Sequence, residues 1–378
     1  MNGASTTGRS ADPERSVVPP IRGSPSSTEV AKVAGSESRS CPPGRPLGRT
    51  ESTLRPANRR AATAAGAATW ARGSGDSIRS AGGVAPRGHD RPATVHAAAG
   101  GVESVRGPRT IPASMRVAAL QFDVRRGEVS ANLEVVCTGL REARERGVEL
   151  LLLPELWPTS FVPAGEKGDW VGASEEALGR VVDLAAELDL AVAGSGYGAA
   201  PGDLPRNRFT LFDRGECLLR YDKVQLFSPT GEGLGFSPGT SPPPTARVRG
   251  LLVSGVVCYD VRFASLLRAP FLAGAELLLV PAQWPVGRAS HWRALLRGRA
   301  VEHQAFVLGA NRTGSETMGR RSALLEFPGN SLVADPAGHL LAEGDGAGGL
   351  VVADLDPRAP GVLRRDVPVR RDERLLEE

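Results

Sequence analysis

The run Leu251-Leu-Val-Ser-Gly-Val-Val-Cys258 is apolar up to a single thiol, and the sequence then turns polar at Tyr259-Asp-Val-Arg262. Continuous apolar runs of this length are typical of strands that are buried on both faces in a parallel sheet. In α/β folds, ligands bind outside the carboxyl ends of such strands. The run therefore predicts an α/β protein in which Cys258 lies at a sheet edge, where a thiol can act as a nucleophile.

Two other predicted strands end in residues that complement a thiol. Glu155 follows the apolar run Leu150–Pro154, and Lys223 follows a strand predicted at Cys217–Tyr221. A nucleophilic thiol needs a base to take its proton, and the charge that develops on an attacked carbonyl needs a cation or amide donors. Taken singly, each residue has an ordinary explanation: a paired carboxylate, a solvated lysine or an inert buried cysteine. Their coincidence at three strand ends favours a catalytic set.

From Met115 onward, short apolar runs alternate with stretches of helical periodicity. Strands are predicted at Arg116–Phe122, Leu150–Pro154, Ala191–Gly196, Arg208–Asp213, Cys217–Tyr221, Leu251–Cys258, Leu277–Pro281, Phe306–Asn311, Ser331–Asp335, Leu340–Ala342 and Val351–Asp354. Helices are predicted at Glu128–Arg146, Ser174–Leu188, Ala264–Ala273 and Trp292–His303. This order predicts one α/β domain, residues 115–378, whose helices cover both faces of its sheet.

Residues 1–114 differ in composition from the rest of the 378-residue chain. They are rich in Ala, Gly, Ser, Pro, Thr and Arg, contain Trp70 as their sole aromatic residue, and carry 16 Arg and Lys against 8 Asp and Glu. Such a stretch cannot bury enough apolar surface to offset its ordering entropy, so it is predicted to be disordered. A translation start at Met115 is the alternative. The arginines are scattered without interleaved aromatic residues, which argues against nucleic-acid binding.

The cysteine pattern and the hydropathy exclude several classes of protein. The four cysteines show no Cys-x-x-Cys or Cys/His metal spacing, so neither a disulfide framework nor a zinc site is indicated. The chain has no run of 18 apolar residues and no apolar leader at its N-terminus. We therefore expect a soluble cytoplasmic protein that needs no metal or cofactor.

Five segments resemble, in family order, the motifs of the nitrilase or carbon–nitrogen hydrolase superfamily. They are Met115-Arg-Val-Ala-Ala-Leu-Gln-Phe-Asp123, Leu152-Leu-Pro-Glu-Leu156, Tyr221-Asp-Lys-Val-Gln-Leu-Phe227, Gly255-Val-Val-Cys-Tyr-Asp-Val-Arg-Phe263 and Ala300-Val-Glu-His-Gln-Ala-Phe306. The resemblance covers residues 115–357. It implies a four-layer αββα sandwich, a Glu–Lys–Cys triad, no metal, and assembly into a homodimer or larger homo-oligomer.

The resemblance also implies roles for individual residues. Glu155 would be the general base, Cys258 the nucleophile that forms a thioester, and Lys223 the cation that holds the oxyanion. The backbone N–H of Tyr259 would assist Lys223. Many members add a second glutamate between the lysine and the cysteine, and here Glu232 is the sole carboxylate in that interval. The alternative for Glu232 is an exposed loop acid between two glycines.

The segment from Pro281 to Trp292, which contains Trp284, resembles the omega-amidase-like branch. That branch releases ammonia from the terminal amide of 2-oxoglutaramate or 2-oxosuccinamate, whose carboxylate needs a cation. Arg262 and Arg288 are the candidates, although Arg262 could instead pair with Asp260. An N-carbamoyl amidohydrolase, a deaminated-glutathione amidase and a catalytically silent binding module are the competing interpretations.

Two segments depart from the family pattern. Ala264-Ser265 replaces the usual Pro-Glu after the nucleophile loop, and Met318–Phe327 differs from the usual short link. Both bear on the substrate and leave the triad untouched.

Overall fold

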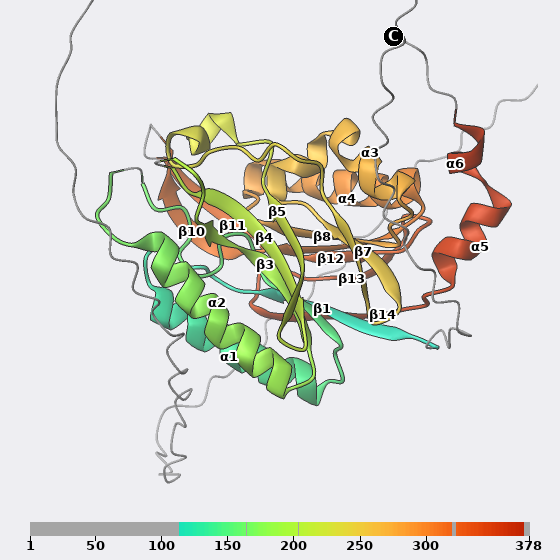
Figure 1. Cartoon of the computed structure of the whole chain (residues 1–378), viewed down its shortest axis with the longest axis horizontal. Helices are drawn as coiled ribbons and strands as arrows, with labels where there is room; N and C mark the ends of the chain where they lie inside the picture. The colour runs from blue at the N-terminus through green and yellow to red at the C-terminus, as the bar shows by residue number, and fades with distance from the viewer. Residues whose placement is uncertain (1–112, 164, 203, 320–322, 374–378) are drawn as a thin grey trace, which may run out of the picture. The chain divides into compact units, whose positions relative to one another are not determined.

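The computed structural model describes residues 113–163, 165–202, 204–319 and 323–373 (Figure 1). The disorder predicted for residues 1–114 falls outside the described residues except at its last two positions, so it stays a prediction, as does the domain boundary. Met115, the first residue of β1, is fully buried.

The first sheet has six strands in the order β14-β1-β2-β3-β4-β5. Its strands are β1 (Met115–Gln121), β2 (Leu150–Leu152), β3 (Ala191–Gly198), β4 (Arg206–Asp213), β5 (Glu216–Asp222) and β14 (Gly349–Leu355). The central strands β1, β2 and β3 are parallel, whereas β14, β4 and β5 pair antiparallel at the two sides. The all-apolar sequence of β2 follows from burial on both faces.

The second sheet also has six strands, in the order β13-β12-β9-β8-β7-β6. Its strands are β6 (Thr245–Val248), β7 (Leu251–Gly255), β8 (Leu277–Ala282), β9 (Phe306–Asn311), β12 (Leu332–Ala334) and β13 (Leu340–Glu343). Again the middle strands, β7, β8 and β9, are parallel. A separate two-stranded ribbon consists of β10 (Thr313–Met318) and β11 (Ala323–Pro328).

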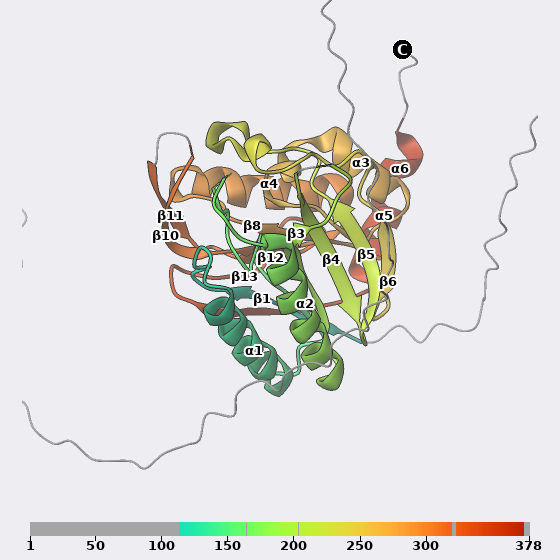
Figure 2. The ribbon, with the colours of Figure 1, turned by 60° about the vertical axis from the view of Figure 1, so that its left-hand side comes forward.

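The two sheets pack face to face and each is covered by helices on its outer side (Figures 1 and 2). The first sheet carries α1 (Val129–Glu145) and α2 (Trp170–Glu187); the second carries α3 (Ala264–Leu272) and α4 (Ala289–His303). This is the four-layer αββα arrangement that the family resemblance implied. The periodicity alone predicted helices on both faces of one sheet, and that prediction is wrong because the inner face of each sheet is buried by the other sheet.

The contact between the sheets forms one continuous apolar core. Alternate residues of β4, Phe209 and Leu211, and alternate residues of β7, Leu251 and Val253, belong to it, as the two-residue period of strands requires. At Gly255 the sheets approach so closely that an added Cβ would lie 2.2 Å from the ring of Phe209. A side chain at this position would therefore force the buried Phe209 ring to move.

Several element boundaries differ from the predictions. Helix α2 begins at Trp170 rather than Ser174, because the Asp169 carboxylate caps it by accepting a hydrogen bond from the N–H of Gly172 (2.8 Å). Helix α3 begins at Ala264 without a capping side chain, in line with the substitution noted at that position. The strands β6, β10 and β11 and the C-terminal helices α5 (Ala359–Asp366) and α6 (Val369–Asp372) were not predicted. Within the described ranges, no helix is both long enough and apolar enough to cross a bilayer.

Candidate active site

The nucleophile candidate lies in a tight turn beyond the end of a strand. The predicted strand Leu251–Cys258 is too long by three residues: β7 ends at Gly255, and Cys258 begins a short 3₁₀ turn with φ of 48°. A left-handed backbone costs a non-glycine residue about 1–2 kcal/mol. Such strain persists where the surrounding structure fixes the conformation, and it clusters at functional sites. The turn holds the thiol above the carboxyl end of the sheet.

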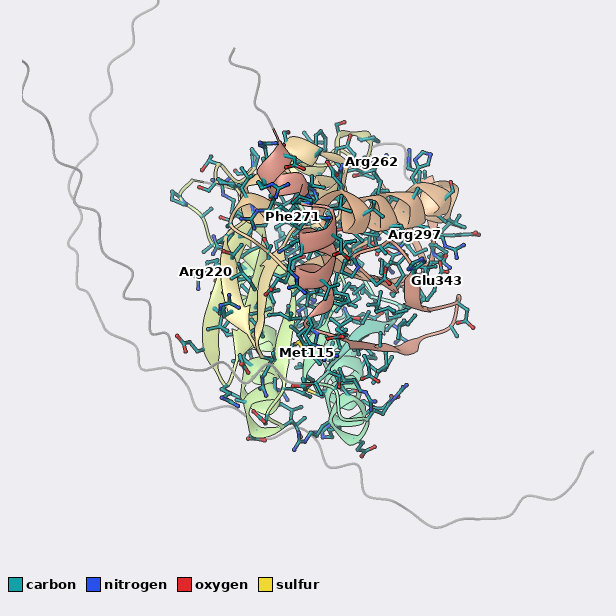
Figure 3. The ribbon with its side chains drawn as sticks, turned by 90° about the vertical axis from the view of Figure 1, so that its right-hand side faces the viewer. Met115, Arg220, Arg262, Phe271, Arg297 and Glu343 are labelled. Atoms are coloured by element: carbon teal, nitrogen blue, oxygen red, sulfur yellow. The ribbon has the colours of Figure 1, made fainter. Side chains whose placement is uncertain are left out.

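The base candidate occupies a similar turn after β2. The residue that follows Glu155, Leu156, also has a left-handed backbone, with φ of 46°, and its N–H donates to Ser195 Oγ (3.0 Å). Tight turns after β2 and β7 therefore bring a carboxylate and a thiol to the same edge of the sandwich. In Figure 3, Arg262, from the nucleophile turn, lies well away from Met115 at the start of β1.

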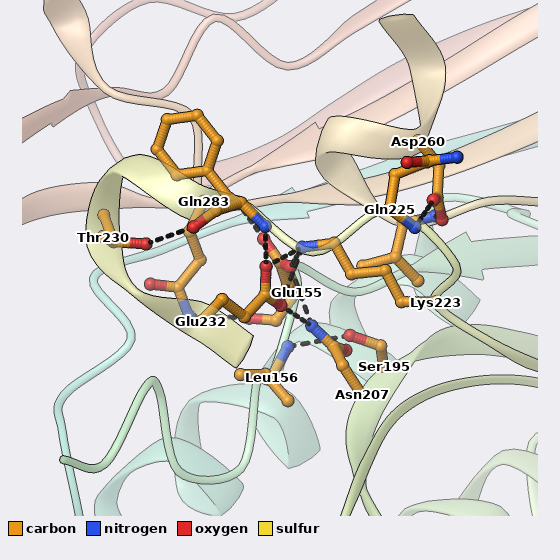
Figure 4. Close-up of polar contacts among 12 residues, drawn as sticks. Glu155, Leu156, Ser195, Asn207, Lys223, Gln225, Thr230, Glu232, Asp260 and Gln283 are labelled. Atoms are coloured by element: carbon orange, nitrogen blue, oxygen red, sulfur yellow. Dashed lines mark hydrogen bonds and ion pairs between the residues drawn. The ribbon is translucent and has the colours of Figure 1, made fainter. Parts of the chain in front are cut away.

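Glu155 is held by donors from both sheets (Figure 4). Its Oε1 accepts hydrogen bonds from Lys223 Nζ (2.8 Å) and Asn207 Nδ2 (2.9 Å). Its Oε2 accepts from the backbone N–H of Gln283 (3.0 Å), and the side-chain amide of Gln283 donates to the Glu155 carbonyl (2.9 Å). Three hydrogen bonds to the carboxyl group and one to the backbone carbonyl fix Glu155 in one orientation.

Lys223 lies between two buried carboxylates. Its Nζ donates to Glu155 and to both oxygens of Glu232 (2.9 Å each). All three side chains are at most 1% exposed. Glu232 also accepts from the N–H of Phe227 (2.6 Å) and from Asn207 Nδ2 (3.2 Å). The alternative that Glu232 is an exposed loop acid is therefore wrong.

The charges of the site follow from burial and from this pairing. Burial would lower the pKa of Lys223, but the two adjacent carboxylates outweigh it and raise that pKa above its ordinary value, so the ammonium stays charged. Burial raises the pKa of Glu155, against the opposing effect of Lys223, and the Glu232 charge raises it further. Burial, followed by the nearby Glu155 charge, raises the pKa of the Cys258 thiol well above its usual range. The thiol therefore rests protonated, hydrogen-bonded to the carboxyl group that can take its proton.

Asn207 and Gln283 were not identified as site residues from the sequence. Asn207 lies on β4 at an inward position, in phase with Phe209 and Leu211 of the core. A polar residue in phase with apolar core residues of a strand is a signal that could have revealed it. Gln283 directly follows β8 at the same sheet edge as the nucleophile turn, which is the position that indicated Glu155 and Lys223.

A pocket of about 480 Å³, measured out to open solvent, lies above these residues. Its polar end is formed by Glu155, Lys223 and Cys258. The other lining side chains are mostly aromatic, apolar or cationic, namely Phe161, Phe227, Tyr259, Trp284, Pro285, Met318, Leu325, Arg262 and Arg288. A small ligand with one polar group at the thiol fits a pocket of this size and polarity.

Two guanidinium groups line the pocket without a carboxylate partner among the described residues. Arg262 lies 4.9 Å from the ring centre of Trp284, with its Nη2 3.1 Å from His291 Nδ1. Arg288 lies 5.5 Å from the ring centre of Phe227. Stacking on aromatic rings orients both groups, and no acid in the part of the chain that the structure describes pairs with either charge.

The predicted alternative for Arg262, a pair with Asp260, does not form. The Asp260 carboxyl is buried and accepts hydrogen bonds from Tyr221 Oη (2.9 Å) and from the N–H groups of Gln225 (2.8 Å) and Val257 (3.1 Å). Burial raises the pKa of Asp260 to about 7. Asp260 thus braces the nucleophile turn without Arg262, whose guanidinium remains available to a ligand.

No cluster of three or more His, Cys, Asp or Glu side chains suited to a metal ion occurs among the described residues. The predicted oxyanion donor, the N–H of Tyr259, belongs to the residue after the nucleophile, and its side chain lines the pocket. Its role stays a prediction.

The family model for carbon-nitrogen hydrolases matches residues 116–364. The chain belongs to this family. Among proteins of known activity, this hydrolase is 33% identical to the 2-oxoglutaramate amidase of Bacillus subtilis (strain 168) over 258 residues, which cover 68% of this chain and 96% of that protein. It is 34% identical to the omega-amidase YafV of Escherichia coli (strain K12) over 204 residues, 53% of this chain and 73% of that protein.

Solved structures agree with this assignment. An amidase from Nesterenkonia sp. superposes on this hydrolase with a TM-score of 0.60 at 34% identity, covering 68% of this chain and 97% of that chain. A variant of the Nesterenkonia sp. AN1 amidase, 33% identical over 68% of this chain and 98% of that chain, also with a TM-score of 0.60, shows covalent addition of the acetamide moiety of fluoroacetamide at the active site cysteine. This hydrolase therefore acts on carbon–nitrogen bonds of linear amides through a cysteine.

Proposed function

We propose that this hydrolase is an omega-amidase that cleaves the terminal amide of a small 2-oxo acid such as 2-oxoglutaramate. The observation that carries the proposal is the pair Arg262 and Arg288 in the pocket that contains Glu155, Lys223 and Cys258. An amide with a carboxylate at its other end presents one group to the thiol and one to these cations. The similarity to proteins named 2-oxoglutaramate amidase and omega-amidase supports the same substrate class.

In the proposed first half-reaction, Glu155 takes the proton of Cys258 as the sulfur attacks the amide carbon. Negative charge develops on the former carbonyl oxygen. Lys223 has three N–H bonds, and its contacts go to Glu155 and to both oxygens of Glu232. One N–H shared between the two Glu232 oxygens leaves a third for this oxyanion, together with the Tyr259 N–H. Collapse of the intermediate breaks the C–N bond, and the proton on Glu155 leaves with the nitrogen as ammonia.

In the second half-reaction, Glu155 takes a proton from water, which attacks the thioester carbon. The new tetrahedral intermediate uses the same oxyanion donors. Breaking the C–S bond releases the 2-oxo diacid, and the sulfur of Cys258 regains its proton from Glu155. Lys223 keeps its own proton throughout, since the two flanking carboxylates hold its pKa above the ordinary value.

The test is ammonia release by the full chain from 2-oxoglutaramate, 2-oxosuccinamate, glutamine, N-carbamoyl amino acids and a simple nitrile. We expect turnover of the two oxo-acid amides that is lost in Cys258→Ala and kept in Cys217→Ala, because Cys217 is an exposed thiol on β5. Arg262→Met and Arg288→Met should raise KM for these substrates far more than for a neutral aliphatic amide. Turnover confined to carbamoyl compounds would overturn the substrate and keep the nucleophile.

Two further expectations belong with this proposal. Family members commonly assemble, so a homodimer or larger homo-oligomer is expected, and sedimentation of the full chain measures it. A cytoplasmic location is also expected, and fractionation of cells that express the tagged full chain tests it.

A further inference from the structure

The ribbon β10–β11 belongs to neither of the six-stranded sheets. It projects at the edge of the sandwich (Figure 2), and it contains most of the segment Met318–Phe327 that departs from the family pattern. Its register pairs Glu316 with Leu325 and Met318 with Ala323. Residues directly opposite each other in an antiparallel pair share a face, so Glu316, Leu325 and Met318 lie on the same face of the ribbon.

The two faces of the ribbon have different environments. On one face, Glu316 and Phe327 are buried, and Met318 and Leu325 are partly buried and line the catalytic pocket. On the other face, Leu324 is 65% exposed. The ribbon therefore contributes two apolar side chains to the pocket, and these do not come from the strands that carry the triad.

A buried arginine fixes the base of the ribbon. Arg312 Nη1 donates to Glu316 Oε2 (2.6 Å) and to Gln283 Oε1 (2.9 Å), and Nη2 donates to Asp123 Oδ1 (2.7 Å). Its guanidinium lies 4.5 Å from the ring centre of Phe327. Since Gln283 also donates to the catalytic carboxylate, the ribbon is tied to the same residue that orients the base. The wall made by Met318 and Leu325 is therefore held at a fixed place relative to the thiol.

We infer that the β10–β11 ribbon, through Met318 and Leu325, determines the length and width of the acyl chain that this hydrolase accepts. The inference rests on the proposed function for the identity of the substrate's two polar ends. The triad fixes one end and the two arginines fix the other, so the intervening carbon chain meets the apolar wall. Misfit by one methylene in an apolar pocket changes kcat/KM by about 10- to 200-fold.

The experiment compares two linear series with the full chain. One series is 2-oxosuccinamate, 2-oxoglutaramate and 2-oxoadipamate, and the other is butyramide, valeramide and hexanamide. In Leu325→Ala and Met318→Ala, the kcat/KM of the longest amide relative to the middle one should rise about tenfold or more. Leu324→Ala, one residue away on the exposed face, is the matched control and should leave the ratio unchanged.

An unchanged ratio in both inner variants, or an equal change in Leu324→Ala, would overturn the inference. Should Leu325→Ala fail to fold, as judged by its melting temperature, Leu325→Val removes a single methylene and gives the same readout with a smaller change. The neutral series keeps the two proposals separate. Absence of wild-type turnover of the oxo-acid amides defeats the proposed function, whereas the chain-length ratio in the neutral series decides the role of the ribbon.

Discussion

Replacing the buried arginine of the ribbon base, Arg312→Met, should destabilise this hydrolase strongly. The Arg312 side chain is 1% exposed and its removal leaves the Glu316 carboxylate, 7% exposed, without its 2.6 Å partner. Breaking a buried ion pair on one side costs about 3–5 kcal/mol. Arg126, 3.7 Å from the other Glu316 oxygen, remains as a weaker partner, so we take the lower figure of about 3 kcal/mol. At roughly 2–4 °C per kcal/mol for a domain of this size, the melting temperature should fall by about 6–12 °C.

The assay is thermal unfolding of the full chain at one fixed protein concentration, because self-association shifts the melting temperature. The exposed pair of Arg116 and Asp354, whose side chains are 44% and 53% exposed, provides the control. Arg116→Met should cost less than about 1 kcal/mol. The double variant Arg312→Met/Glu316→Leu should recover much of the loss, since an apolar pair can replace a buried ion pair at little cost. The reasoning is refuted if Arg312→Met melts like the Arg116 control, or if the double variant melts no higher than Arg312→Met alone.

Two further predictions concern single polar residues around the triad. Asn207→Leu removes a hydrogen-bond donor to both Glu155 and Glu232. A lost hydrogen bond to a charged group costs ~1.5 kcal/mol, so kcat should fall about tenfold or more. Steady-state kinetics that show a raised KM with unchanged kcat would contradict this. Burial raises the pKa of Asp260 from 3.8 to about 7, so this group contributes stability that is complete below pH 4 and is lost as the pH rises through 7. Urea unfolding should therefore show Asp260→Asn gaining stability relative to the wild type between pH 4 and 7, and a difference that does not vary with pH would exclude this account.

The sequence predicted the triad because each member lies at or just beyond the end of a predicted strand. Glu155, Lys223 and Cys258 all lie just beyond a strand at one edge of the sandwich, and strand ends can be recognised without knowledge of tertiary structure. Glu232 was identified by its place between the lysine and the cysteine. Asn207 was missed because it lies inside a strand, and its importance depends on which face of β4 turns inward, a property that packing decides.

The ribbon and the order of the layers could not be predicted from local sequence patterns. The β10 sequence Thr313-Gly-Ser-Glu-Thr-Met318 has no apolar alternation, and its strand is stabilised by the distant contacts of Arg312. Likewise, an apolar strand has the same sequence pattern whether a helix or a second sheet covers it. The periodicity therefore gave the number and type of most elements but could not distinguish one sheet covered on both faces from two sheets that cover each other.

The two halves of the proposed catalytic set come from different sheets: Glu155 and Lys223 follow strands of the first, whereas Cys258 follows β7 of the second. A molecule in which only one of the two sheets has formed lacks part of this set and should have no amidase activity. The first sheet includes β14, the last strand of the described chain, paired with β1, the first. During synthesis on the ribosome, this sheet therefore lacks one strand until Leu355 has emerged. Turnover is thus a reporter of the docking of the two sheets, and the recovery of amidase activity after dilution from denaturant times that event directly.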